Sequence, residues 1–284
     1  MPIDPGRAIG HRMPEVETSW TPDDVILYHL GLGAGVPPTA PGELEYCYEG
    51  NLKVLPSFGV IAAQPALAGI MGVPGLEFNP AMLLHGEQDL VLHRPIPTAA
   101  RVTTSGTVAA VYDKGKAAVA VLETETRTGD GTLLLVNRWS MFLRGEGGFG
   151  GDPGPKAEDP RPDREPDRVA SFTTLPQQAL LYRLCGDKNP LHADPAFAAL
   201  GGFDRPILHG LCTFGIACKA VVDTLLGGDV TRVERYRTRF SGVVFPGDTV
   251  VTSMWEQGDR ILIEAATAES GRPVLSNASI TVRR

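Results

Sequence analysis

Two short sequences, YRLCGDKNPLHADP at residues 182–195 and RPILHG at residues 205–210, carry most of the information in this chain. Pro190 disfavours the helical conformation at the residue before it, so the helix that precedes it is predicted to end there. A tight turn then follows. Asp187 and His192 therefore lie across a turn rather than on one helix face, and both can point at one small volume.

An aspartate and a histidine in this arrangement suit general acid–base chemistry. Their ordinary pKa values, about 3.9 and 6.5, leave one group charged and the other neutral near pH 7. Together they can hold one water, with one group taking a proton while the other supplies one. Asn189, between them, can hydrogen-bond the pair or the water. Taken alone, this pattern more often has a structural explanation, in which Asp187 caps the turn and His192 packs in it.

Gly210 is predicted to begin a long buried helix. The first N–H groups of a helix have no partner within it and lie at its positive end, so the N–H of Gly210 could stabilise a developing oxyanion. The alternative is a glycine that only permits close backbone packing, and by itself Gly210 would favour that alternative. An apolar stripe at helical spacing follows, formed by Leu211, Phe214, Cys218, Val221, Val222 and Leu225 and ended by Gly227-Gly228.

The chain also repeats itself weakly. Tyr28 and Tyr182 end similar apolar runs, at an offset of 182 − 28 = 154 residues, and Val54-Leu55-Pro56 matches Ile207-Leu208-His209 at an offset of 153. Each match is followed by small and apolar residues at helical spacing. Residues 144–168, rich in Gly, Pro and charged side chains, read as a linker over the surface. The sequence thus predicts an N-terminal unit at 1–143, this linker, and a C-terminal unit at 169–284.

Each half ends in residues typical of antiparallel strands. In each half, one long helix followed by such strands predicts an α+β unit with the helix wrapped by an antiparallel sheet. Two of these units in tandem would form a pseudo-dimer. The predicted strands are 88–96, 101–112, 116–127 and 132–143 in the first half, and 234–245, 248–256, 260–268 and 273–282 in the second.

Composition excludes several classes of protein. The net charge of −7 over 284 residues argues against a broad nucleic-acid surface, and no apolar run is long enough to predict a membrane span. No secretory leader is expected at the N-terminus. The four cysteines form no C-x-x-C pair, which predicts neither a disulfide framework nor a structural zinc site and suits the reducing cytoplasm.

Three further patterns receive the plainer interpretation. The G-x-G-x-x-G at residues 145–150 is followed by prolines rather than a helix, so it is read as linker. His209 and Cys212 could form a nucleophile pair, but Cys212 is predicted to pack in the helix. A metal site from Asp187, His192 and His209 has no supporting ligand spacing, and none is predicted.

The two quoted sequences resemble the signature of the (R)-specific enoyl-CoA hydratases, also called hydratase 2 or the MaoC-like family. The longer members of this family are two hot-dog units in one polypeptide, so the resemblance implies a double hot-dog fold over nearly the whole chain. One departure is Cys185, where the signature usually has serine. By resemblance, the catalytic residues are Asp187, His192, Asn189 and Gly210. The substrate-binding residues implied are His85, Gly86, Lys114, Lys188, Pro190, Leu191 and Phe240.

The resemblance implies reversible hydration of a trans-2-enoyl-CoA to a (3R)-3-hydroxyacyl-CoA, in fatty-acid or sterol side-chain metabolism. It implies an acyl-CoA substrate, a homodimer, and neither a redox cofactor nor a metal. At the offset of 154, Gly33, Gly35 and Pro38 stand where Asp187, Asn189 and His192 stand in the second half. We therefore expect one active site per chain, with the first half helping to bind substrate. The alternatives are a hot-dog acyl-CoA thioesterase and a non-catalytic acyl-CoA or acyl-carrier binding module.

Overall fold

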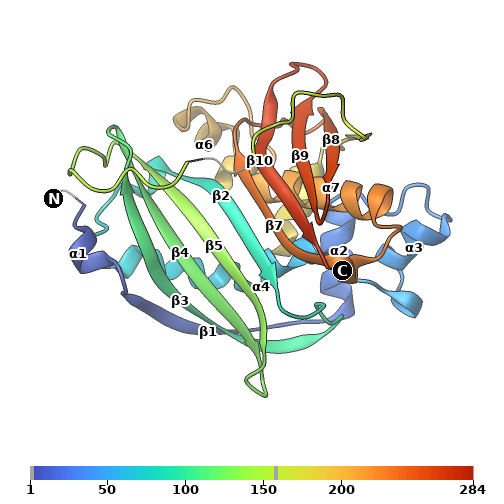
Figure 1. Ribbon diagram of the computed structural model, residues 1–284, viewed down its shortest axis with the longest axis horizontal. Helices are drawn as coiled ribbons and strands as arrows, with labels where there is room; N and C mark the ends of the chain where they lie inside the picture. Colours follow the sequence, from blue (N-terminus) through green and yellow to red (C-terminus); the bar gives the residue numbers. More distant parts are fainter. Residues whose placement is uncertain (1–2, 157–158, 284) are drawn as a thin grey trace.

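The computed structural model describes residues 3–156 and 159–283, which form two similar α+β units (Figure 1). The helices are α1 (Pro5–Ala8), α2 (Pro22–Gly31), α3 (Pro41–Cys47), α4 (Gly59–Ala63), α5 (Gln178–Tyr182), α6 (Pro195–Leu200) and α7 (Gly210–Leu225). The strands are β1 (Arg12–Trp20), β2 (Leu83–Leu92), β3 (Ala100–Asp113), β4 (Ala117–Thr128), β5 (Leu133–Arg144), β6 (Arg168–Thr173), β7 (Val233–Phe240), β8 (Thr249–Gln257), β9 (Arg260–Thr267) and β10 (Pro273–Val282).

The strands of both units join in one antiparallel sheet of ten strands, in the order β1-β3-β4-β5-β2-β7-β10-β9-β8-β6. Strands β2 and β7 pair where the units meet, with Glu87 opposite Arg239 and Asp89 close to Arg235 in the pairing register. Arg239 donates to Glu87 at 2.7 Å and Arg235 to Asp89 at 2.8 Å. Hydrogen bonds and opposite charges therefore hold the two units together along this seam.

Each unit buries helical segments against its own strands. Helix α7 packs on β6, β7 and β8, and α4 packs on β1, β3, β4 and β5. The second-half helix is as long as predicted, but its first-half counterpart is not one continuous helix. It breaks after Ala63 into a 3₁₀ segment, η3 (Gln64–Gly72), because Pro65 has no N–H to continue the α-helical bonding.

The internal repeat is visible at the centre of the molecule. Helices α2 and α5 lie together, and the repeat-related Tyr28 and Tyr182 face one another with ring centroids 5.9 Å apart. Gly31 allows this approach, since a Cβ there would lie 3.3 Å from the Cα of Tyr182. The buried apolar residues of both units form one continuous cluster around this point.

Two predicted strands differ markedly from the structure in their bounds, and two strands were not predicted. The predicted strand 234–245 is β7, which ends earlier, at Phe240. The predicted strand 88–96 is β2, which begins at Leu83, so His85 and Gly86 lie on a strand. Strands β1 and β6 were not predicted. Both lie at the edges of the sheet, where few side chains are buried and the alternation of apolar and polar residues is weak.

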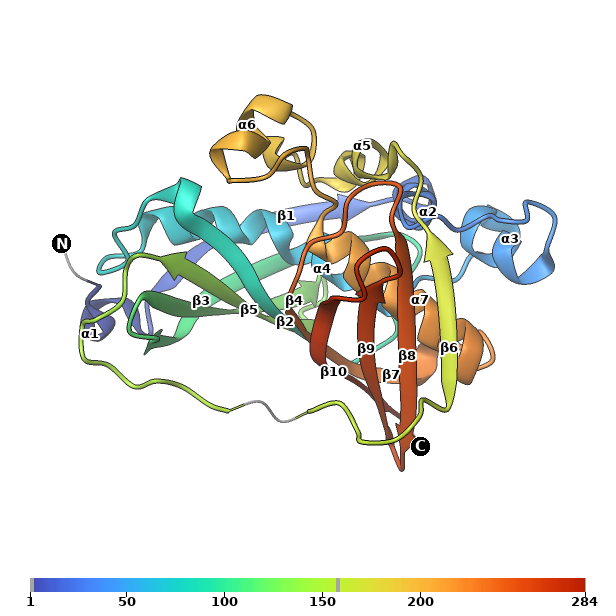
Figure 2. The ribbon, with the colours of Figure 1, turned by 90° about the horizontal axis from the view of Figure 1, so that it is seen from above.

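The described parts of the connection between the units, residues 145–156 and 159–167, run along one side of the molecule, opposite α5 and α6 (Figure 2). Most of its described side chains are exposed, as a surface linker requires, but Asp159 is an exception at 3 % exposure. Its carboxylate accepts from Ser279 at 2.8 Å and contacts Arg237 at 2.5 Å. The expectation of a purely superficial linker is therefore wrong at this residue, which ties the connection to the C-terminal sheet.

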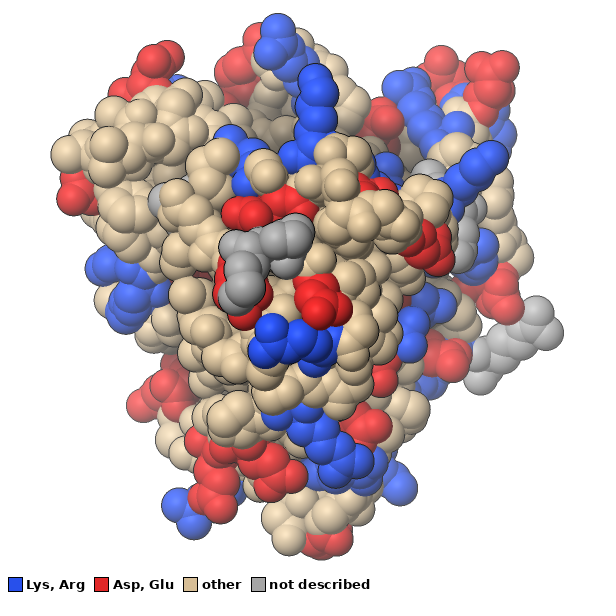
Figure 3. Space-filling model, turned by 90° about the vertical axis from the view of Figure 1, so that its left-hand side faces the viewer, with Lys and Arg blue, Asp and Glu red and all other residues tan. Residues whose placement is uncertain are grey.

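On the face shown in Figure 3, basic and acidic side chains are interspersed rather than gathered by sign. Among the described residues, no helix is long and apolar enough to cross a membrane.

Candidate active site

The turn that carries Asp187 begins where α5 and its 3₁₀ extension, η5 (Arg183–Cys185), end. Gly186 adopts a φ of +135°, a conformation that side-chain-bearing residues rarely take, and this turns the chain sharply before Asp187. The N–H of Asn189 donates to Oδ1 of Asp187 at 3.1 Å, and Oδ1 of Asn189 accepts from the N–H of Leu191 at 3.0 Å. Asn189 thus holds the turn and, through its backbone, the carboxylate.

His192 ends the next 3₁₀ segment, η6 (Pro190–His192), and is 8 % exposed. Its Nδ1 lies 2.9 Å from the carbonyl oxygen of Ile207. Because a carbonyl only accepts, Nδ1 carries the proton and Nε2 keeps its lone pair. Burial lowers the pKa of His192, while the Ile207 contact and the Asp187 charge act in the opposite direction. The imidazole is therefore neutral near pH 7, with Nε2 available as a base.

Gly210 is the first residue of α7, as predicted, and its backbone is exposed. An added Cβ would lie 3.1 Å from Cδ1 of Phe240, so the aromatic ring lies directly against this helix start. The helix N-terminus therefore presents its N–H groups next to Phe240.

Phe240 also lines a cavity of about 530 Å³. It is formed where β2, β3, β4, β5 and β7 converge with Pro155 of the connection. Four residues implied by the family resemblance line it together: His85, Gly86, Lys114 and Phe240. The other three, Lys188, Pro190 and Leu191, do not line this cavity and lie on the turn that carries Asp187 and His192.

His85 connects the cavity to the acid–base pair. Its ring lies 4.9 Å from that of Phe240, and Nε2 donates to the carbonyl of Glu87 at 3.0 Å. Burial lowers the pKa of His85 to about 4, and the Glu87 contact and the charge of Asp187 act against this effect. His85 and Phe240 line the cavity, and Phe240 also lies against Gly210, so these two rings stand between the cavity and the start of α7.

Lys114 also lines this cavity. Its ammonium is exposed, contacts the carbonyl of Pro153 and lies 5.7 Å from the ring centroid of Tyr112. The lysine is thus placed to meet a negatively charged group that enters the cavity from outside.

His209, which the sequence offered only as a nucleophile partner of Cys212 or as a metal ligand, is a direct neighbour of the acid–base pair. Its ring stacks on His192 with centroids 3.7 Å apart, and Nε2 lies 3.2 Å from the carbonyl oxygen of Asp187. The predicted alternative of a His209–Cys212 nucleophile pair is absent from this arrangement. Cys212 is buried with Sγ 3.5 Å from the carbonyl of Gly31, and burial raises its pKa well above the ordinary value.

Donor atoms of Asp187, His192 and His209 lie within 4.8 Å of one another, which is the separation of metal ligands. The ring geometry does not fit a metal site, however. The two imidazole planes are inclined by only 29°, and a cation would have to lie in both planes at about 2.1 Å from each nitrogen.

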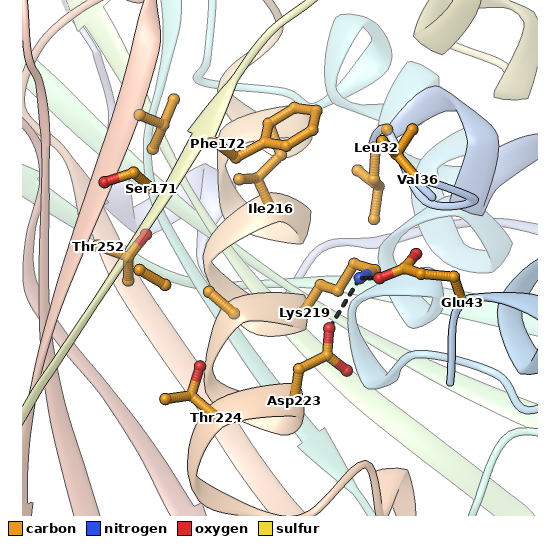
Figure 4. A pocket seen from close by; sticks show the side chains of 14 residues that line it. Leu32, Val36, Glu43, Ser171, Phe172, Ile216, Lys219, Asp223, Thr224 and Thr252 are labelled. Atoms are coloured by element: carbon orange, nitrogen blue, oxygen red, sulfur yellow. Dashed lines mark hydrogen bonds and ion pairs between the residues drawn. The ribbon is translucent and has the colours of Figure 1, made fainter. Parts of the chain in front are cut away.

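The counterpart region of the first unit is built differently (Figure 4). Gly33, which replaces Asp187 in the repeat, has a φ of +89°, and a Cβ there would lie 2.0 Å from Cζ of Phe172. The cavity beside it, about 270 Å³, contains Lys219 paired with Glu43 at 2.6 Å and with Asp223 at 2.7 Å. The described residues that line it include no histidine, so none of them forms an aspartate–histidine pair like that of Asp187 and His192.

A carboxylate, a neutral imidazole and a helix N-terminus beside a cavity, built on two hot-dog units in one chain, define an acid–base enzyme of the double hot-dog class. Residues 19–145 match the family model described as the MFE-2 hydratase 2 N-terminal domain, and residues 157–278 match that of the MaoC-like domain. The chain belongs to this hydratase 2 (MaoC-like) family.

Individual relatives agree with this assignment. The chain is 46% identical over 283 residues to the enoyl-CoA hydratase ChsH3 of Mycobacterium tuberculosis, covering 99% of both chains. It is 42% identical to the peroxisomal multifunctional enzyme type 2 of Mus musculus, covering 96% of this chain and 38% of that protein. Among solved structures, the MaoC-like dehydratase of Phytophthora capsici superposes with a TM-score of 0.86 at 31% identity, covering 98% of both chains.

Proposed function

We propose that this chain catalyses the reversible hydration of a trans-2-enoyl-CoA to a (3R)-3-hydroxyacyl-CoA. The observation that carries the proposal is the convergence of Asp187 and His192 with His209, the residue before the first residue of α7, whose Gly210 lies against the cavity-lining Phe240. The family supports the same reaction, since its relatives of similar length are named enoyl-CoA hydratases.

In the proposed reaction, the thioester carbonyl of the substrate accepts a hydrogen bond from the N–H of Gly210. This polarises the conjugated double bond, makes C3 electrophilic and stabilises the enolate-like transition state. A water held between Asp187 and Nε2 of His192 gives one proton to the pair, and its oxygen forms the new bond to C3. The pair then returns one proton to C2, so the substrate gains one water overall.

The neutral state of His192 is essential to this sequence. The Ile207 carbonyl fixes the proton on Nδ1, which leaves Nε2 to take a proton from the water. Burial, which lowers the pKa of His192, keeps that nitrogen unprotonated at neutral pH.

The cavity would hold the CoA part of the substrate. Lys114 in its lining suits a phosphate, and Phe240, also in its lining, lies against Gly210 at the start of α7. Because β2, β3, β4 and β5 supply most of the lining, we propose that the first unit acts as the substrate-binding partner of the catalytic second unit.

The test is an assay with crotonyl-CoA that follows loss of the enoyl-thioester absorbance, free thiol and product chirality together. We expect absorbance loss without thiol release, a (3R)-hydroxy product, and the reverse reaction from that product. Release of free CoA would instead indicate a thioesterase, and binding without turnover would indicate a binding module. Either result would contradict the proposal.

We further propose that the protein acts as a homodimer in the cytoplasm. Family resemblance supports the homodimer, and four unpaired cysteines suit a reducing compartment. Sedimentation should give twice the chain mass of 30.3 kDa, and a monomer mass would contradict the first part.

A further inference from the structure

His209 touches each part of the acid–base site but has no role in the chemistry described above. It is 1 % exposed and immediately precedes Gly210, with φ −59° and ψ 133°. Its ring stacks on His192, and its Nε2 contacts the carbonyl of Asp187. Tyr182 also packs against it, with ring centroids 4.9 Å apart.

The contact with Asp187 determines the protonation of His209. A carbonyl oxygen only accepts, so Nε2 is the donor and the ring is the Nε2–H tautomer. Burial and the neighbouring His192 lower the pKa of His209 to about 3, so the ring is neutral. Its Nδ1 is buried and has no hydrogen-bond partner among the described residues, which is a costly arrangement for a residue whose role is only packing.

The internal repeat provides a natural comparison. At the offset of 153, Pro56 stands in the first unit where His209 stands in the second. The apolar neighbour Leu208 is matched by Leu55, and Tyr182 by Tyr28, so the packing residues are retained. His209 is therefore absent from the unit that also lacks Asp187, Asn189 and His192.

We propose that His209 is a positioning residue for the hydration reaction. Its Nε2–H holds the backbone of Asp187 and its ring face supports His192, so that the carboxylate and Nε2 of His192 meet the same water. This inference rests on the proposed function and adds to it a residue that acts through the pair rather than on the substrate.

Two substitutions test the Nε2–H donor and the ring of His209 separately. His209→Phe keeps a flat ring against His192 but removes the donor to Asp187, whereas His209→Gln keeps an amide donor and loses the ring. We expect His209→Phe to lower kcat about 10²-fold, since small displacements of reacting groups have effects of this size. KM should stay within about threefold, because His85, Lys114 and Phe240 are unchanged. His209→Gln should recover part of the loss and remain about 3- to 10-fold below the wild type.

A double variant tests whether His209 acts through the pair. In an Asp187→Asn background, adding His209→Phe should change the residual kcat by less than about twofold, because the group that it positions is already inactive. The matched control is His29→Gln, another buried neutral histidine with two backbone contacts, which should lose stability while keeping kcat.

Failure of this inference is distinguishable from failure of the proposed function. A wild-type enzyme without hydratase activity would refute the function itself. An active wild type, together with a folded His209→Phe variant of near-normal kcat, would refute only the role of His209. If His209→Phe does not fold, the His209→Gln variant decides: wild-type kcat, or a change in KM alone, would overturn the proposal.

Discussion

At the site, side chains carry the reacting groups, and backbone groups hold those side chains in position. The carbonyl of Ile207 sets the tautomer of His192, and the N–H of Asn189 holds the carboxylate of Asp187. The sequence pattern identified both reacting side chains and named His209 beside them, but it did not predict the contacts of His209 with His192 and with the backbone of Asp187. Such a contact has no signature in residue spacing.

The N–H of Gly210 can be tested alone, because the helix start tolerates proline. Proline is favoured at the first helical position, and the ψ of 133° at His209 is compatible with a following proline. Gly210→Pro removes the donor, whereas Gly210→Ala adds a Cβ near Phe240 but keeps it. We predict that Gly210→Pro lowers kcat roughly 10²- to 10³-fold relative to Gly210→Ala in the hydration assay. Equal rates for the two variants would exclude this N–H from the reaction.

The sequence predicted the helices and strands that have strong local signals, such as capping residues or a regular apolar pattern. Helix α2 has a capping box between Thr21 and Asp24, and α6 is capped by Asp194, so local side chains define where both helices begin. The edge strands β1 and β6 were missed, because an edge exposes most side chains and shows little periodicity. Pairing of distant strands, rather than local preference, creates these two elements.

His29 shows how one side chain can join elements. From α2, its Nδ1 donates to the carbonyl of Tyr46 in α3 at 2.8 Å, and its Nε2 accepts from the N–H of Leu55 at 3.2 Å. His29→Ala leaves both buried backbone groups unpaired and opens a cavity, so we predict a loss of about 3 kcal/mol in the free energy of unfolding. Urea titration would measure this loss. The exposed His93→Ala variant, the control, should change by less than about 0.5 kcal/mol.

On the scale of the whole molecule, the continuous sheet and the single apolar cluster predict that both units unfold together. The repeat in the sequence indicated two units and their α+β class. It could not show the seam between β2 and β7 or the burial of Asp159, because both depend on side chains far apart in the chain. The first unit supplies most of the cavity lining, and the second unit supplies Asp187 and His192.

Several buried histidines make the folded molecule sensitive to acid. Burial lowers the pKa of His29 and His85 to about 4, and it also lowers that of His192. The folded pKa values lie below the unfolded one, so the unfolded chain binds more protons as pH falls below about 6.5. The contribution of these groups to stability is therefore fully present above that pH and falls toward pH 4, by up to about 1.4 kcal/mol per pH unit for each of His29 and His85.

Urea midpoints between pH 7 and pH 5, where carboxylates titrate little, would measure this slope. We predict a falling midpoint that becomes less steep in the His29→Gln variant. A midpoint independent of pH over this range would show that these histidines are not held neutral by the fold.

Turnover of the Asp187→Asn and His192→Gln variants on crotonyl-CoA tests whether this pair activates the water. Both substitutions keep side-chain size and hydrogen-bonding capacity while removing the group that exchanges a proton. We predict that each variant remains folded, retains its KM within about threefold and loses about 10²- to 10⁴-fold in kcat. A folded variant that hydrates crotonyl-CoA within a few-fold of the wild-type rate would contradict this role of Asp187 and His192.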